Sequence, residues 1–280
     1  MDVLTTNDER ANAQLFALNR ARGHVHIELA AHDGVTRRQM VDESGSLRVR
    51  FPNPEGAWCE AMLVNNAGGI AGGDRFAVQL RLEENARLNL TTASAEKVYR
   101  SHGPFSDVDV RIDVAGGAAL RWLPQETIMF DQARMRRAFE INLALDAELV
   151  MAEMIVFGRH AMGEVVTGGA FVDRWRVRRN GQLIFADQIA LGDNIQTMLA
   201  HKACGDRAVA LATIVIVPGN DVIVEAMRAA MPVTESEFGV SAWNGLALAR
   251  FCSNDAAAMR RDVVAALRCL VEKIPRAWIN

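Results

Sequence analysis

The chain has 280 residues, half of them hydrophobic and 23% charged, which excludes an intrinsically disordered protein. Its 31 basic residues nearly balance 34 acidic ones, and the formal net charge of −3 excludes the strongly basic surface typical of nucleic-acid-binding proteins. The sequence shows no apolar run long enough for a transmembrane helix and no signal pattern near its start, and its four cysteines are scattered. We therefore expect a cytoplasmic protein with reduced thiols and no membrane partner.

Alternation of apolar and polar residues with a period of two dominates the chain and predicts half-buried β-strands. Asn180-Gly181 lies between two further runs and predicts a two-residue hairpin turn. The strand candidates number more than ten and are closely spaced, which is typical of a mostly β fold rather than of βαβ units. We expect one large antiparallel β-rich domain with a few helices and no internal repeat. The clearest runs are 25–29, 47–51, 76–82, 108–114, 139–145, 208–217 and 246–252.

Helical periodicity is found mainly towards the C-terminus. Apolar residues recur at helical spacing from Met259 to Ile274, and Asn254 or Asp255 is the expected N-cap. This helix and its flanks, Phe251 to Trp278, either cover an end of the β core or form a surface for a partner. The other helical candidates are 194–203 and, with a strand as the alternative, 221–231.

One tetrapeptide suggests an enzyme. Asn65-Asn66-Ala67-Gly68 resembles a motif of short-chain dehydrogenases, which also need a glycine-rich cofactor turn upstream. Residues 1–60 contain only isolated glycines. That family also uses a tyrosine followed four residues later by lysine, whereas the single tyrosine, Tyr99, is followed at that distance by Gly103. An oxidoreductase therefore stays an alternative supported by this tetrapeptide alone.

Polar and glycine-rich segments interrupt the strand pattern at several places. Two glycine pairs surround an apolar dipeptide at 68–73 and predict a tight bend before the next strand. Further along, Gln125, Glu126 and Thr127 interrupt an apolar stretch. Because buried polar groups need partners or water, this insertion predicts a hydrogen-bonded network or a wet interior, with an exposed loop as the alternative.

Four motifs follow one another in a fixed order. They are G-G-x-x-G-G-D at 68–74, T-T-x-x-x-x-K-V-Y-R at 91–100, W-L-P-Q-E-x-I-x-F at 122–130 and G-R-x-x-x-G-E at 158–164. As an ordered set they resemble the urease accessory protein UreD family, also called UreH. The resemblance covers about residues 20–270, and it leaves 1–20 as a variable N-terminal extension and 21–280 as a single β-rich domain.

The resemblance implies a non-catalytic factor of urease maturation, the process that loads nickel into apo-urease. It also implies partners, namely apo-urease and a UreF-type protein that recruits the GTPase UreG. In this scheme UreG binds GTP and carries nickel, so the present chain holds no tightly bound cofactor and meets nickel only in transit. The route proposed for the family is a water-filled path through the UreD-like protein. A scaffold that recruits partners without passing metal is the alternative.

Carboxylates within the matched motifs are candidates for such a path, because oxygen ligands can bind nickel weakly enough to release it. The histidines and cysteines do not show the spacing of a tight metal site, so we assign no metal ligand. An ordinary turn bond or ion pair is the alternative for each carboxylate. The candidates are Asp74, Glu96, Glu126, Asp131 and Glu164, and Gly68, Gly69, Gly72 and Gly73 are expected to be structural glycines.

Overall fold

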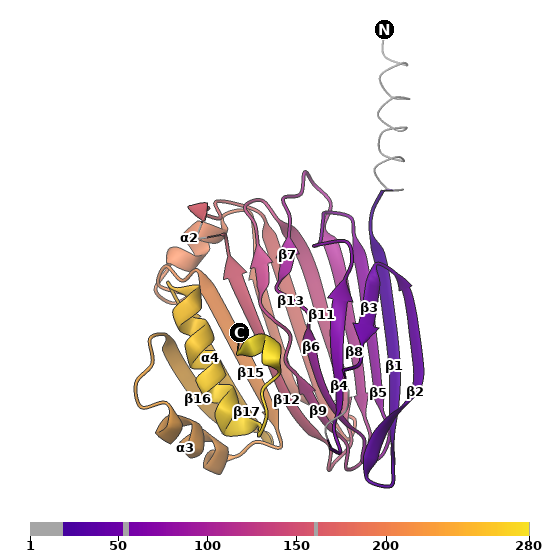
Figure 1. The fold of residues 1–280 in the computed structure, drawn as a ribbon. Coiled ribbons are helices and arrows are strands. Elements are labelled where there is room, and N and C mark those ends of the chain that lie inside the picture. Colours follow the sequence, from indigo (N-terminus) through magenta and orange to yellow (C-terminus); the bar gives the residue numbers. More distant parts are fainter. Residues whose placement is uncertain (1–18, 53–55, 160–161, 280) are drawn as a thin grey trace.

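Two β-sheets face each other, and helices near the C-terminus cover the outer face of one of them (Figure 1). The computed structural model describes residues 19–52, 56–159 and 162–279. The first sheet, called sheet A below, has the order β14-β13-β11-β8-β5-β1-β2. Its strands are β1 (Arg22–His32), β2 (Val35–Gly45), β5 (Arg75–Leu82), β8 (Ser106–Val114), β11 (Arg134–Leu143), β13 (Ala170–Arg179) and β14 (Gln182–Leu191).

The second sheet, sheet B, has the order β16-β17-β15-β12-β9-β6-β4-β3. Two short strands add to this sheet: β10 (Thr127–Met129) pairs with β12, and β7 (Glu96–Val98) pairs with β10. The other strands are β3 (Leu47–Arg50), β4 (Cys59–Asn65), β6 (Arg87–Thr92), β9 (Ala119–Trp122), β12 (Glu148–Phe157), β15 (Ala210–Val217), β16 (Glu237–Trp243) and β17 (Leu246–Ser253). The helices are α2 (Ile195–Ala200), α3 (Asp221–Ala230), α4 (Ala256–Leu270) and the 3-10 turn η2 (Arg276–Trp278).

The alternating apolar residues form the core between the sheets, as the sequence predicts. Val25, Ile27 and Leu29 of β1 are fully buried, and the intervening polar residues face outward. Burial of this kind stabilises a fold by about 25 cal/mol for each square ångström of apolar surface removed from water. The mostly β class with few helices is therefore confirmed. The hairpin predicted at Asn180-Gly181 is also confirmed, since it joins β13 to β14 with both turn residues at positive φ.

The antiparallel arrangement expected from the sequence is wrong for the middle of both sheets. There the chain passes back and forth between the sheets, from β5 to β6, β8 to β9 and β11 to β12. The chain returns to a sheet only after it has formed a strand in the opposite sheet. Neighbouring strands of one sheet, such as β5 and β8, therefore run parallel. The sequence could not reveal this, since an alternating pattern reports which face is buried and not which strand is the neighbour.

The passages from sheet A to sheet B are tight turns that repeat three times. Ala86, Ala118 and Ala147 are each fully buried, and each backbone N–H donates to the carbonyl three residues earlier. A buried leucine follows two residues later in every copy, at Leu88, Leu120 and Leu149. The same type of turn is therefore used at each of these passages.

The passages from sheet B back to sheet A are much longer and lie at the opposite end of the sheets. Their described residues are 66–74, 93–105, 123–133, 158–159 and 162–169, and they contain most of the motif residues. β7 and β10 lie within these connections and pair in parallel with each other, and β10 also pairs with β12. The fold therefore gathers all four motifs at one end of the two sheets.

A second apolar core forms between the outer face of sheet B and the C-terminal helices. Helix α4 begins after Asp255, whose carboxylate accepts bonds from the N–H groups of Ala257 and Ala258, so the predicted N-cap is confirmed. The segment 221–231 is a helix, α3, rather than a strand, and α2 is shorter than expected. No helix among the described residues is long and apolar enough to cross a membrane.

Candidate functional site

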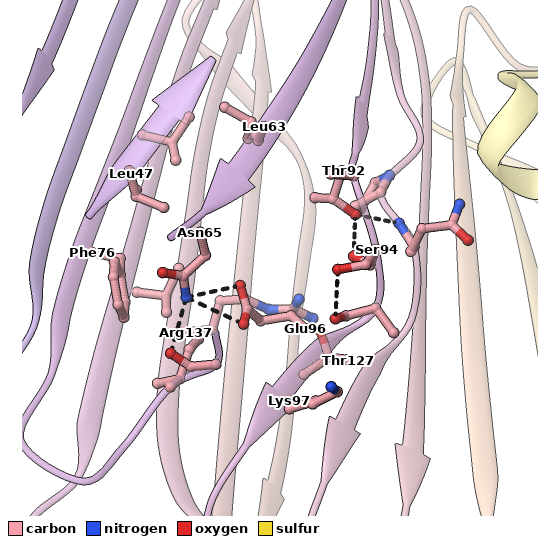
Figure 2. A pocket seen from close by; sticks show the side chains of 18 of the residues that line it. Leu47, Leu63, Asn65, Phe76, Thr92, Ser94, Glu96, Lys97, Thr127 and Arg137 are labelled. Atoms are coloured by element: carbon pink, nitrogen blue, oxygen red, sulfur yellow. Dashed lines mark hydrogen bonds between the residues drawn. The ribbon is translucent and has the colours of Figure 1, made fainter. Parts of the chain in front are cut away.

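A cavity of about 240 Å³ lies between the sheets at the end that carries the motif connections. Its wall includes the exposed residues Ser94 and Lys97 as well as the buried Arg137 and Glu153. The cavity therefore leads from the surface into the space between the sheets (Figure 2). Among the described residues that line it, the charged ones are Glu96, Lys97, Arg137 and Glu153.

Glu96 is the carboxylate in the outer part of this cavity. Asn65 at the end of β4 donates from Nδ2 to both carboxylate oxygens of Glu96, at 3.3 Å each (Figure 2). Burial raises the pKa of Glu96 to about 7, although the bonds from Asn65 and the nearby charge of Lys97 favour the ionised form. This carboxyl group therefore exchanges protons near neutral pH.

Asn65 holds its position through bonds on both sides of its amide. Oδ1 accepts from the N–H of Ala67 at 3.0 Å, and Nδ2 donates to the carbonyl of Gly69 at the same distance. These partners assign the orientation of the amide, so that its N–H groups face Glu96. The tetrapeptide that resembles a dehydrogenase motif thus forms a turn beside the cavity, in a part of the chain that has no βαβ unit among its described residues.

A network of charged residues lies at the inner end of the cavity. Arg137 of β11 donates to both oxygens of Asp173 on the neighbouring strand β13, at 3.0 and 2.7 Å. It also donates to Glu153 of β12, in the opposite sheet, at 2.6 Å. The second oxygen of Glu153 accepts from Nε1 of Trp122 at 2.7 Å. All three charged side chains are at most 5% exposed.

With both carboxylates ionised, this network holds two negative charges and one positive charge. Burial opposes the charge of Arg137, but Asp173 and Glu153 outweigh it and raise its pKa, so the guanidinium stays charged. Burial likewise raises the pKa of Glu153, despite the opposing influence of Arg137. Glu153 also borders a small cavity of about 10 Å³, lined by Asp173 and Asp187, which has room for about one water molecule.

The glycine pairs form the bend that the sequence predicts. Gly69 has a φ of 149°, and a Cβ there would lie 2.5 Å from the ring of Tyr99. At Gly72 a Cβ would collide with the hydroxyl of Ser101. Close backbone approach therefore requires glycine at both positions. Gly68 and Gly73 have positive φ values, and Asp74 closes the bend by accepting from the N–H groups of Ala21 and Ala71.

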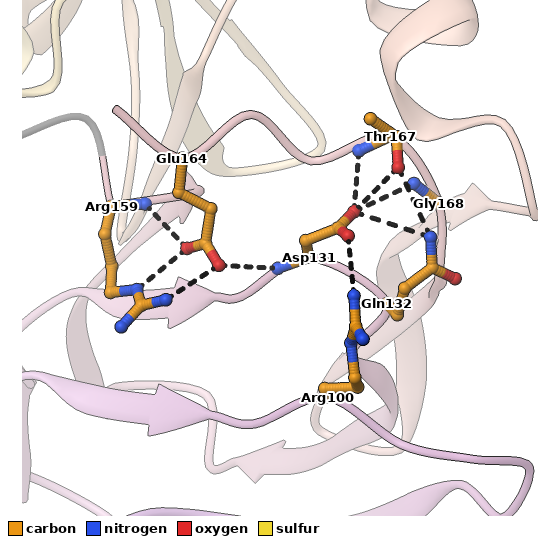
Figure 3. Close-up of polar contacts among 7 residues, drawn as sticks. All are labelled: Arg100, Asp131, Gln132, Arg159, Glu164, Thr167 and Gly168. Atoms are coloured by element: carbon orange, nitrogen blue, oxygen red, sulfur yellow. Dashed lines mark hydrogen bonds and ion pairs between the residues drawn. The ribbon is translucent and has the colours of Figure 1, made fainter. Parts of the chain in front are cut away.

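Asp131 and Glu164 tie the motif connections to each other (Figure 3). Asp131 accepts from the backbone and hydroxyl of Thr167, from the N–H of Gly168 and from Arg100. Partial burial opposes ionisation of Asp131, but these bonds outweigh it and lower its pKa. Glu164 accepts from the backbone and guanidinium of Arg159, which lower the pKa of Glu164 as well.

Glu126 lies between two residues that line the cavity, but its own side chain bonds to the C-terminal layer, which consists of the helices α3 and α4 and the turn η2. It accepts from Arg260 of α4 at 2.7 Å. Its neighbours Gln125 and Thr127 line the cavity and are 7% and 5% exposed. Gln125 and Thr127 are therefore buried, and Gln125 and Glu126 both bond to Arg260, so the segment is not an exposed loop.

The structure thus brings only one of the five predicted carboxylates, Glu96, to the wall of the central cavity, while the other four hold turns or connections together. Sequence reasoning missed Asn65, Arg137 and Glu153. The signal for the last two was their position, because each is the one charged residue on the otherwise apolar inward face of its strand. A charged residue at such a position needs a buried partner.

Tight metal sites need several ligands close together. Among the residues that the structure describes, no group of three or more His, Cys, Asp or Glu side chains could hold a metal ion. The four cysteines are free thiols, and burial raises the pKa of Cys59 to about 11. Cys59, the most buried of the four cysteines, is therefore protonated at neutral pH.

Comparison with known proteins gives a consistent result. The sequence model described as "UreD urease accessory protein" matches residues 21–278. A protein named "Urease accessory protein UreD" from Rhodopseudomonas palustris strain BisA53 is 54% identical over 276 residues, which are 99% of this chain and 96% of the relative. A second, from strain CGA009, is 50% identical over 99% of this chain and all of the relative. "Urease accessory protein UreD 3" from Bradyrhizobium sp. strain BTAi1 is 51% identical over 96% of this chain and 98% of the relative. The chain therefore belongs to the UreD family of urease accessory proteins.

Proposed function

We propose that this chain is a non-catalytic scaffold of urease maturation that passes nickel to apo-urease along the cavity between its sheets. In this proposal the chain binds apo-urease and a UreF-type protein that recruits the GTPase UreG, and it works in the cytoplasm. Nickel is the cargo rather than a resident cofactor, and GTP is bound by the partner. Membership of the UreD family supports the urease part of the proposal.

The observation that carries the nickel path is the pair of buried carboxyl groups, Asp173 and Glu153, that share the single guanidinium of Arg137 at the inner end of the cavity. Arg137 neutralises only one of the two buried carboxylates, Asp173 and Glu153, that bond to it. In a medium of low effective dielectric constant, an uncompensated carboxylate attracts a cation far more strongly than it would in water. Burial raises the pKa of Glu153, and a hydrated divalent cation in the cavity favours the ionised form again, so the cation is drawn towards Glu153 as this group gives up its proton.

The chemistry of the cavity also favours release. The polar groups that line it are mainly hydroxyls, amides and carboxylates, including Thr92, Thr127 and Glu96. Oxygen donors of this kind bind nickel more weakly than thiolate or clustered imidazole ligands. A path must bind its cargo weakly at each point, because a deep energy minimum would trap the metal.

The test is activation of apo-urease by the purified chain together with its UreF-type and UreG-type partners, Ni²⁺ and GTP. The variant Glu153→Gln removes the second ionisable carboxyl group but leaves the bonded pair of Arg137 and Asp173. We expect it to assemble normally and to deliver nickel about tenfold more slowly, a change that corresponds to about 1.4 kcal/mol in the barrier. The matched control is Glu148→Gln, on the same strand but facing solvent.

Each outcome decides between specific alternatives. Undiminished nickel delivery by Glu153→Gln in an intact complex would favour a scaffold that recruits partners without passing metal. Urease activation that does not depend on the wild-type chain would contradict the maturation role. Tight binding of NAD by the isolated chain would revive the oxidoreductase interpretation that the Asn65-Asn66-Ala67-Gly68 segment suggests.

A further inference from the structure

One wall of the central cavity is a connection with few backbone bonds of its own. Residues 123–126 join β9 to β10 without belonging to a strand. Leu123 and Gln125 are almost fully buried, and Pro124, Gln125 and Thr127 line the cavity. Backbone bonds join Leu123 to Leu90 and Glu126 to Glu96, and side-chain contacts hold the rest of this connection, which is outside the regular ladder of the sheet.

The other side of the same connection is held by the C-terminal layer. Arg260 of α4 donates to Oε2 of Glu126 at 2.7 Å and to Oε1 of Gln125 at 2.8 Å. It also donates to the carbonyl of Ala277 at 3.0 Å, and its guanidinium lies 4.9 Å from the centre of the Trp278 ring. One side chain therefore joins α4, the C-terminal turn and the cavity wall.

Trp278 reinforces this contact from the C-terminal turn. Its indole is 2% exposed, and Nε1 donates to the carbonyl of Leu123 at 2.9 Å. On its other side, the same connection is hydrogen-bonded to residues that line the outer part of the cavity. The N–H of Gln125 donates to the hydroxyl of Thr92, and the N–H of Glu96 donates to the carbonyl of Glu126. A displacement of the connection is thus passed on to Glu96.

We propose that Arg260 is a positioning residue for nickel passage: it fixes the wall of the central cavity at residues 123–127 and so couples the C-terminal layer to the cavity. The proposal rests on the function proposed above. Without Arg260 the amide oxygen of Gln125, a residue 7% exposed, loses its bonded partner, and the carboxylate of Glu126 loses its counter-charge. Both groups then turn towards water and draw the connection with them.

The neighbouring arginine supplies a matched control. Arg261 also lies on α4, but it bonds to Glu235, and the two side chains are 59% and 57% exposed. The variants Arg260→Met and Arg261→Met remove the same charge from adjacent positions of one helix. Only the first removes a contact with the cavity wall. A general effect on helix α4 or on net charge would therefore appear in both variants.

The first measurement is amide hydrogen exchange of the full-length chain, followed by mass spectrometry. For Arg260→Met we expect exchange at least about fivefold faster in peptides covering 93–98 and 123–130, because local opening there loses its strongest restraint. Arg261→Met should leave these peptides unchanged. Unchanged exchange in Arg260→Met would overturn the positioning role, whatever the outcome for urease.

The second measurement is urease activation as a function of nickel concentration. For Arg260→Met we expect the nickel concentration giving half-maximal activation to rise by about twofold to thirtyfold, the range of couplings that such networks carry. The maximal rate and the assembly with partners should be retained, whereas a merely unstable protein would lose both in proportion. Arg260→Lys should restore activation in part, since lysine can keep the ion pair with Glu126 but cannot make all the bonds.

The two measurements separate the possible failures. Faster exchange with an unchanged nickel dependence would overturn the coupling to nickel passage while leaving the contact itself established. If the wild-type chain does not stimulate urease activation, the proposed function fails, and the exchange result then stands by itself as a statement about the fold.

Discussion

Arg137 and Glu153 face each other across the space between the sheets, and their side chains join sheet A to sheet B through a bond of 2.6 Å. Asp173 shares the same guanidinium from within sheet A. The contact lies at the inner end of the central cavity, so the two residues serve both the stability of the fold and the charge that nickel would meet.

The stability of this network should depend on which member is removed. Arg137→Met leaves two carboxylates buried without a counter-charge, and we expect it to lower the free energy of unfolding by about 3–5 kcal/mol. Glu153→Gln leaves one positive and one negative charge, so we expect a much smaller change. Urea denaturation at pH 7 measures both values. An equal loss in the two variants would contradict the charge count.

Glu96 should make the stability of the protein depend on pH. Its pKa is raised in the folded state from 4.5 to about 7, so the folded protein binds an extra proton between these values. The stabilisation from this group is complete below pH 4.5 and is lost as the pH rises through 7. We expect Glu96→Gln to match the wild type at pH 4.5 and to be more stable than it by about 2 kcal/mol at pH 8, allowing for partial exposure. Urea midpoints at the two pH values test this, and a constant difference would contradict it.

The bend at Gly69 should not tolerate a side chain. Gly69→Ala would bring a Cβ to 2.5 Å from the ring of Tyr99, at a φ that L-residues rarely adopt. We expect a loss of about 1–3 kcal/mol in the free energy of unfolding. Gly239→Ala is the control, because the space around this residue of β16 is open, and it should change stability by less than about 0.5 kcal/mol. Thermal unfolding of both variants gives the comparison.

Asp131 should stabilise the motif connections only while it is ionised. The pKa of Asp131 is lowered in the folded state, so its contribution is complete above its ordinary pKa of 3.8 and is lost as the pH falls further. At pH 7 we expect Asp131→Ala to cost about 1–3 kcal/mol, the range for removing a partner of several hydrogen bonds. The exposed Asp193, with its side chain 84% exposed, supplies the control variant Asp193→Ala. A cost for Asp131→Ala that persists undiminished at pH 2.5 would argue against this explanation.

The sequence predicted the strands far better than their partners. Alternation marks the buried face of β1 or β8 from local residues alone, because neighbouring side chains of a strand point to opposite faces. Pairing depends on the path of the chain between the sheets, and short segments such as 115–118 look the same in a hairpin and in a passage between sheets. The parallel centre of both sheets was therefore not predictable from spacing.

The candidate site shows the same division. Motif position led to Glu96, which does line the cavity, and also to Asp131 and Glu164, which each accept from a backbone N–H of a neighbouring connection. A carboxylate in a polar motif has many possible partners, and the sequence does not say which one it meets. Asn65 drew attention through an unrelated motif, whereas its actual contact is with a residue 31 positions away.

By itself, the sequence determined the β-rich class, the inward faces of the strands, the C-terminal helix with its cap, and, through its ordered motifs, the family. These features depend on local periodicity, turn chemistry and residue identity, all of which are read along the chain. Only the tertiary structure decided which strands pair, that the four motif connections meet at one end, and that Arg137, Glu153 and Asp173 share one buried network. The energy of such a network comes from contacts between distant residues, and a buried charge is stabilised only by the partner that the fold brings to it.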